Sequence, residues 1–296
     1  MESKKSELAN FIWQNNVKDV PAHISPNHDC LYVIDGGALL YKVTWPRPAD
    51  YSMILESYVQ FVKSNYSGAI IVFDGYENEP STKVMTQMKR RGATSAPKVV
   101  FKESNAVSLK RDAFLTNNEN KQALVNHLGI HLIKAGYQVK HASADADTLI
   151  AKTAIDAVQD QNVTLVADDT DLLCLLLFHL SVNAPYRLTM KTKYARQYDI
   201  KLLKESLGVE MCRHILFAHA ITGCDTTSRI HGIGKPTVMK LLSTDSIFRR
   251  VSAEFLNSEN PFSKDTIAVA GETAVKMLYG ETGDCNIDKL RLKKLR

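Results

Sequence analysis

Three short apolar runs of this sequence each end in an aspartate, and this repeated pattern limits the folds open to the chain. The runs are CLYVID at 30–35, AIIVFD at 69–74 and VTLVAD at 163–168. Apolar runs of this length, bounded by turn residues, are typical of strands buried in a parallel sheet. Segments with helical spacing separate them, as right-handed crossover connections require. The sequence therefore predicts an α/β fold in which helices flank a parallel sheet.

The acidic residues gather where these strands end. Asp35 and Asp74 each close a predicted strand, so both are expected at the same edge of the sheet, where α/β proteins bind ligands. A denser group lies in the stretch 143–173, at a predicted helix start and after the third apolar run; its members are Asp145, Asp147, Asp168, Asp169 and Asp171. Taken singly, each of these acids has an ordinary interpretation as a helix cap or a turn residue.

Taken together, these carboxylates predict a metal site. Carboxylates at one edge repel one another unless a cation lies between them. Oxygen-only ligands suit Mg²⁺, and Mn²⁺ as well, better than Zn²⁺. Two such ions about 4 Å apart are the usual arrangement for in-line attack on a phosphodiester. The sequence thus indicates two divalent ions and phosphodiester chemistry.

Composition excludes several other classes of protein. A chain of 296 residues with 45% hydrophobic and 23% charged residues can form one large domain or two small ones and is not disordered. No apolar run is long enough to span a membrane, and the first residues lack the pattern of a signal peptide. We therefore expect an intracellular, nuclear protein with no membrane partner. Five scattered cysteines without a CxxC pair indicate buried free thiols.

The segment 83–111 carries the chain's net excess of positive charge. It contains eight basic residues and one acid, Glu103, within a chain whose net charge is only +5. Such a segment beside an acidic site suits a polyanion held over metal ions, and a solvated surface loop explains it equally well. The same region holds Thr116 in a capping-box pattern before a helix with an apolar stripe at Leu124, Leu128 and Leu132. His127 and His131 have metal-ligand spacing, but we expect them on the polar face of that helix.

The last third of the chain has a different character. Residues 198–208 and 209–221 are predicted to be two helices that are broken at Gly208. The stretch TGCDTTSRIHGIGKPTVMKLL at 222–242 follows, with a Gly-Ile-Gly turn before a helix. Glycines at a helix N-terminus let backbone N–H groups approach a phosphate. Asp225, Lys235 and Lys240 strengthen this interpretation.

Five motifs in order, VIDGG, VFDGY, SADADT, VADDTD and TGCD…GIGK, resemble the flap endonuclease family of structure-specific 5′-nucleases. The resemblance runs from Leu31 to Leu242 and is strongest to flap-endonuclease-like proteins with a TGCDTTS…GIGK signature. It implies a PIN-like nuclease core over about 1–200, a helical arch inserted at about 76–136, and a helix–hairpin–helix DNA-binding module over 201–296.

The resemblance also implies roles for single residues. One ion would be held by Asp35, Asp74 and Asp147, with Asp145 contributing, and the other by Asp169, Asp171 and Asp225. Tyr41 would stack on a base, and Lys83 with Arg90 or Arg91 would polarise the scissile phosphate from the arch. The hairpin at Gly232 and Gly234 would contact the DNA backbone and can hold K⁺ through backbone oxygens; Lys235 and Lys240 would bind DNA beside it.

The chain departs from the family at three points. It begins Met-Glu-Ser instead of Met-Gly-Ile, has Asp145-x-Asp147 where Glu-x-Glu is usual, and shows no sliding-clamp peptide. The favoured function is hydrolysis of flapped or branched DNA by a two-metal 5′-flap endonuclease or 5′–3′ exonuclease of DNA repair. The alternatives are a catalytically silent nucleic-acid-binding scaffold and a PIN-like ribonuclease. Protein partners are not indicated.

Overall fold

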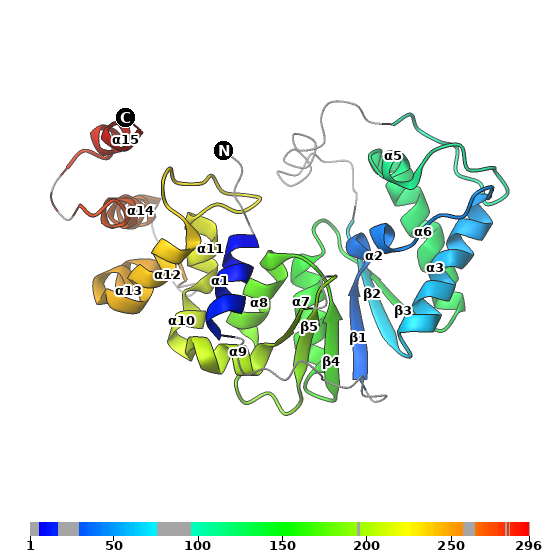
Figure 1. The fold of residues 1–296 in the computed structure, drawn as a ribbon, viewed down its shortest axis with the longest axis horizontal. Helices are drawn as coiled ribbons and strands as arrows, with labels where there is room; N and C mark the ends of the chain where they lie inside the picture. Colours follow the sequence, from blue (N-terminus) through cyan, green and yellow to red (C-terminus); the bar gives the residue numbers. More distant parts are fainter. Residues whose placement is uncertain are drawn as a thin grey trace. The chain divides into compact units, whose positions relative to one another are not determined.

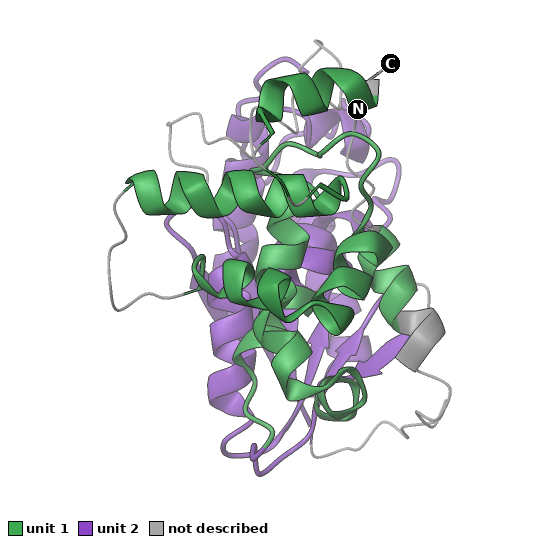
Figure 2. Cartoon of the chain, turned by 90° about the vertical axis from the view of Figure 1, so that its left-hand side faces the viewer, with its two compact units in different colours: residues 1–20, 173–182, 201–296 green, residues 21–172, 183–200 purple. Residues whose placement is uncertain are grey.

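The structure, a computed structural model, describes residues 6–16, 30–75, 96–193, 196–256, 264–281, 283 and 285–295. The chain divides into two compact units (Figure 2). Unit 2 comprises residues 21–172 and 183–200, and unit 1 comprises residues 1–20, 173–182 and 201–296. The domain boundary expected near residue 200 remains a prediction.

Unit 2 is built on a mostly parallel sheet (Figure 1). Within the described residues its order is β3-β2-β1-β4-β5-β6. The strands are β1 (Cys30–Asp35), β2 (Ala69–Phe73), β3 (Gln138–His141), β4 (Asn162–Val166), β5 (Leu188–Lys191) and β6 (Gln197–Asp199). All neighbours pair in parallel except β5 and β6, which are antiparallel. The predicted α/β class and parallel sheet are confirmed.

Helices cover the sheet of unit 2. They are α2 (Gly36–Lys42), α3 (Tyr51–Asn65), α5 (Arg111–Phe114), α6 (Asn118–Lys134) and α7 (Asp147–Ala157). Helices α3 and α6 pack against each other, and their apolar side chains share one core with Ile34, Ile71 and Phe73 of the strands. Helix α7 packs on β1 and β4. Because side chains alternate along a strand, the buried Val33 and Leu165 point to the opposite face of the sheet from Ile34.

Unit 1 is helical in its described part. Its helices are α1 (Ser6–Asn16), α9 (Ile200–Leu207), α10 (Val209–Arg213), α11 (Ile215–Ile221), α12 (Lys235–Thr244), α13 (Ser246–Ala253), α14 (Lys264–Leu278) and α15 (Ile287–Leu295). The first residue of α9 is the last of unit 2, and the rest of that helix belongs to unit 1. Helix α8 (Thr170–His179) begins in unit 2 and continues in unit 1. None of the described helices is both long and apolar enough to cross a membrane.

Two local predictions were wrong. Residues 198 and 199, expected at the start of a helix, instead belong to β6, which pairs with β5. The N-cap of α6 is Asn117, not Thr116; its side chain accepts hydrogen bonds from the N–H groups of Glu119 and Asn120. The Thr116 hydroxyl instead accepts from Ala96 N–H and donates to the Ala113 carbonyl.

The carboxyl ends of β1 and β2 approach each other closely because of one glycine. A Cβ on Gly36 would collide with the Phe73 ring and lie 2.7 Å from the Val72 carbonyl oxygen. Gly36 begins α2 directly after Asp35, and Phe73 precedes Asp74. The missing side chain therefore sets the spacing between the two strand ends that carry acids.

We expect Gly36→Ala to destabilise the protein by about 2–3 kcal/mol, since the methyl group must displace backbone as well as a ring. The measurement is urea denaturation followed by far-UV circular dichroism. Gly68→Ala is the matched control, because nothing lies within 4 Å of its added Cβ. That variant should change the unfolding free energy by no more than about 0.5 kcal/mol. Equal losses in the two variants would contradict the packing argument.

Candidate metal centre and nucleic-acid interface

Asp35 and Asp74 lie at the carboxyl edge of the sheet, as predicted. Asp35 caps α2, and its Oδ1 accepts a hydrogen bond of 3.1 Å from Ala38 N–H. Asp74 Oδ1 accepts one of 3.0 Å from Ala146 N–H. A Cβ on Gly37 would lie 3.2 Å from Asp35 Oδ1 and 3.3 Å from Asp74 Oδ2. The glycine therefore keeps the space beside the two carboxylates open, which fits a site for a cation.

The environment of Asp35 opposes its negative charge. Burial raises the pKa of this carboxyl to about 6; the Ala38 N–H acts against this shift, while the charges of Asp74 and Asp169 add to it. A proton on Asp35 relieves the repulsion, and a divalent cation would relieve it more completely.

Three further carboxylates converge at the starts of α7 and α8. Asp147 is the first residue of α7, and Asp169 and Asp171 flank Thr170, the first residue of α8. One oxygen from each of the three lies within 4.8 Å of the others. Asp169 Oδ1 also accepts from Asp171 N–H at 3.0 Å, which fixes the turn between them. We call Asp147, Asp169 and Asp171 the acidic triad; its carboxylate oxygens suit Mg²⁺ or Mn²⁺.

The neighbouring acids have separate environments. The structure brings Asp147 together with Asp169 and Asp171, whereas the sequence analysis placed it with Asp35 and Asp74. Asp145 is exposed, and its Oδ1 accepts from Asp147 N–H at 3.1 Å. Asp168 Oδ1 accepts from Lys193 N–H at 2.6 Å, a structural role consistent with its place outside the predicted ligands. How the acids divide between two ions remains a prediction.

Sequence analysis missed two lysines at this edge. Lys121, in the first turn of α6, is buried with its Nζ 4.0 Å from Asp74 Oδ2. Burial lowers the pKa of the Lys42 ammonium, and the charges of Asp168 and Asp35 act against that shift. Lys121 lies three residues before Leu124 on the apolar stripe of α6, and a lysine on such a stripe was the available signal.

The predicted phosphate-polarising residues Lys83, Arg90 and Arg91 lie outside the described residues. Tyr41 is described and partly exposed at the end of α2. The Arg111 guanidinium lies over its ring, 5.9 Å from the centroid, and donates to the Tyr41 carbonyl oxygen at 2.9 Å. Part of the ring is thus available for stacking and part is engaged within the chain.

In unit 1, the residues predicted to grip DNA flank a tight turn. Gly232 has a φ of +72° and is exposed, and Gly234 is the N-cap of α12. Lys240 is exposed on that helix, where it can reach a phosphate. Asp225 lies half-buried in the loop after α11. Its predicted role as a metal ligand remains a prediction.

Lys235 is buried, so its ammonium does not point into solvent. Its Nζ lies 3.1 Å from His219 Nδ1, 3.0 Å from Thr222 Oγ1 and 3.4 Å from the Gly223 carbonyl oxygen. These inward-facing acceptors surround the Lys235 ammonium and are not the backbone oxygens of the hairpin. The K⁺ expected at those backbone oxygens remains a prediction.

One other cluster of chemically active side chains, two histidines around an acid, has a structural role. His127 Nδ1 and His131 Nε2 each lie 3.1 Å from Glu103 Oε1, and these hydrogen bonds lower the pKa of Glu103. Within the described part of the chain, the acidic triad is the group of three whose ligand atoms converge closely enough for a metal ion. The five cysteines are free, as predicted, but only Cys174 and Cys212 are buried, whereas the other three are half-buried.

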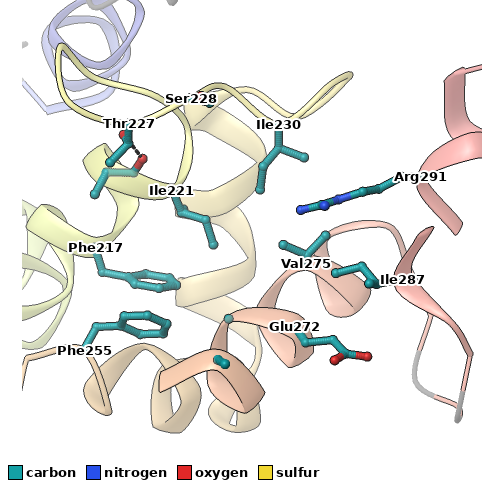
Figure 3. A pocket seen from close by; sticks show the side chains of 13 residues that line it. Phe217, Ile221, Thr227, Ser228, Ile230, Phe255, Glu272, Val275, Ile287 and Arg291 are labelled. Atoms are coloured by element: carbon teal, nitrogen blue, oxygen red, sulfur yellow. Dashed lines mark hydrogen bonds between the residues drawn. The ribbon is translucent and has the colours of Figure 1, made fainter. Parts of the chain in front are cut away.

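Unit 1 also contains an apolar groove of about 540 Å³ (Figure 3). Phe217, Ile221, Phe255 and Val275 supply apolar lining, and Arg291 of α15 extends over it. An apolar lining suits neither a phosphate nor a hard cation, so the groove has no part in the proposed chemistry.

No family model and no curated protein matches this sequence. Solved structures to which this chain is similar include the catalytic core of Rad2 in complex with DNA substrate, at 13% identity and a TM-score of 0.45, covering 90% of this chain and 92% of that one. Another is the Holliday junction-resolving enzyme GEN1 in complex with product DNA and Mg²⁺ ion, at 12% identity and a TM-score of 0.43, covering 89% and 60%. The α/β class of this chain rests on its own sheet and helices.

We expect Lys235→Met to lower the free energy of unfolding by about 1–3 kcal/mol, because methionine leaves buried acceptors without a donor. The measurement is urea denaturation of the full chain. Lys240→Met, on the exposed face of the same helix, should change stability by less than about 0.5 kcal/mol. Similar effects of the two substitutions would show that the Lys235 ammonium has no structural role.

Asp35 should make the metal-free protein less stable as the pH rises. Its folded pKa of about 6 lies above the usual 3.8, so the folded state binds more protons between pH 4 and 6 and loses stability across that window. Asp35→Asn should therefore stabilise the protein at pH 7.5 by on the order of 2 kcal/mol and leave it unchanged at pH 4. Denaturation in EDTA at both pH values measures this, with exposed Asp156→Asn as control. A gain at pH 4 equal to that at pH 7.5 would contradict the assignment.

Proposed function

We propose that this protein is a divalent-metal-dependent nuclease that hydrolyses phosphodiester bonds of flapped or branched DNA. The observation that carries the proposal is the acidic triad at the starts of α7 and α8, whose oxygens lie within 4.8 Å of one another. Asp35 and Asp74 at the carboxyl edge of the same unit add two more acids. The five ordered motifs that resemble flap endonucleases support DNA as the substrate.

The chain's own residues hold and balance charge in this site. Asp147, Asp169 and Asp171 are the ligands, and the positive ends of α7 and α8 offset part of their negative charge. A divalent ion bound there supplies a Lewis acid for the attacking water and the phosphate oxygens. Asp35, with a pKa of about 6, is deprotonated above neutral pH and then adds its charge to the cation site.

A two-ion arrangement is the finer form of the proposal. By the resemblance to flap endonucleases, one Mg²⁺ or Mn²⁺ would be held by Asp35, Asp74 and Asp147 with a contribution from Asp145. The resemblance assigns a second ion to Asp169, Asp171 and Asp225. Basic residues of the arch, Lys83 with Arg90 or Arg91, stabilise charge on the phosphate. Tyr41 stacks on a base near the cut.

The module around the hairpin positions the duplex. Exposed Gly232 lets the backbone approach a phosphate, and Lys240 adds a charge on the exposed face of α12. Lys235 is buried, so it contributes to the hairpin from inside. A nuclear location is consistent with a DNA substrate and is part of the proposal.

The test is cleavage of a labelled 5′-flap DNA in Mg²⁺ or Mn²⁺, with nicked and single-stranded DNA and a matched RNA flap alongside. Asp171→Asn should lower the cleavage rate at least about 100-fold, since it removes a ligand from the triad. The exposed Asp156→Asn should cleave at the wild-type rate.

Each alternative predicts a different outcome of that assay. Binding of flapped DNA without cleavage in either metal would identify a silent scaffold, and preferential cleavage of the RNA flap would identify a ribonuclease. Cleavage that survives Asp171→Asn would refute the proposed site.

A further inference from the structure

Lys121 places a positive charge inside a site otherwise defined by carboxylates. It lies in the first turn of α6, and its Nζ is 4.0 Å from Asp74 Oδ2. The residue is only 7% exposed, and Leu124, Val125 and Leu128 of the same helix are fully buried. A lysine in this position is held in place by the packing of its helix and does not sample solvent freely.

A buried ammonium is costly unless an opposite charge lies close to it. Asp74 meets this requirement, and it is the acid that sequence patterns assign to a metal ion. One carboxylate oxygen of Asp74 accepts from Ala146 N–H, and the other faces Lys121. Both of its oxygens thus already have partners within unit 2.

The charges around the edge are unevenly distributed. Lys121 lies beside Asp74, and the charges of Asp168 and Asp35 act on the Lys42 ammonium. The acidic triad, in contrast, gathers three carboxylates whose oxygens lie within 4.8 Å. A divalent ion approaching the triad meets concentrated negative charge, whereas one approaching Asp74 is repelled by the ammonium beside it.

We propose that Lys121 is a positioning residue that acts as the fixed counter-cation of Asp74, so that the DNA-free protein binds its first divalent ion at the acidic triad and disfavours an ion at Asp74. The inference rests on the proposed function, because it concerns the metal site of that nuclease. It adds an internal cation, specific to this chain's own residues, that sets the order in which the two ions bind.

The experiment is titration of the metal-free full chain with Mn²⁺, with free Mn²⁺ followed by electron paramagnetic resonance at pH 7.5. Lys121→Met should bind Mn²⁺ about tenfold more tightly, because the repulsion at Asp74 is removed. Lys121→Arg, which keeps the charge, and Lys134→Met, exposed near the other end of α6, should match the wild type. A lysine with a merely structural role would leave Mn²⁺ affinity unchanged or weaken it, and either result would overturn the proposal.

The double variant Lys121→Met with Asp74→Asn is a second, independent test of the role of Lys121. It removes both charges at once and leaves no unpaired ion in the interior. Under the proposal its Mn²⁺ dissociation constant stays within about threefold of the wild type, because the two lost charges offset each other. If Asp74 is instead a ligand of the first ion, the double variant binds as weakly as Asp74→Asn alone, which overturns the proposal.

Asp171→Asn separates this inference from the function on which it rests. Loss of Mn²⁺ binding in that variant, with no tightening in Lys121→Met, refutes only the role of Lys121. Unchanged Mn²⁺ binding in Asp171→Asn refutes the metal site itself, and with it the proposed function.

Discussion

The repulsion among carboxylates at the edge of one parallel sheet is the constraint on which the rest of unit 2 depends. Parallel strands bring their carboxyl ends to the same edge, so Asp35 and Asp74 come together as a consequence of topology. Gly36 lets Phe73 approach, and Gly37 leaves space beside both acids. A fold optimised only for stability would place apolar or oppositely charged residues here. A cation bound at this edge, as proposed, would relieve this repulsion.

The protein lowers that repulsion by three means that compete with one another. A proton can bind Asp35, whose pKa lies near 6. The positive ends of α7 and α8 lie at Asp147 and Asp171. Lys121 lies beside Asp74, and the Lys42 ammonium interacts electrostatically with Asp168. A divalent ion bound as proposed would be a fourth means and would displace the proton first, since a proton is exchanged more readily than a packed side chain. The proposed metal binding would therefore be coupled to pH.

Sequence patterns predicted β1, β2 and β4, because apolar runs between turn residues indicate burial directly. The Asp35 cap of α2 is also a local feature, since its hydrogen bond spans only three residues. Sequence patterns failed where a contact with a residue distant in the sequence determines the local structure. Thr116 has the right spacing for a helix cap, yet its hydroxyl accepts a hydrogen bond from Ala96 N–H instead. Residues 197–199 form a strand only because β5 lies beside them. The convergence of Asp147 with Asp169 and Asp171 depends on how two helices start, which spacing alone does not specify.

Lysines were the residues that sequence reasoning placed worst, and the physical reason is general. A lysine near a predicted phosphate site is taken as a surface charge, but its long apolar stem also allows the ammonium to be buried with acceptors. Lys235 reaches inward to His219 and Thr222, whereas Lys240 on the same helix is exposed. Lys121 lies on the apolar stripe of α6. For both buried lysines the stripe position distinguishes inside from outside, so periodicity should be applied to charged residues as strictly as to leucines.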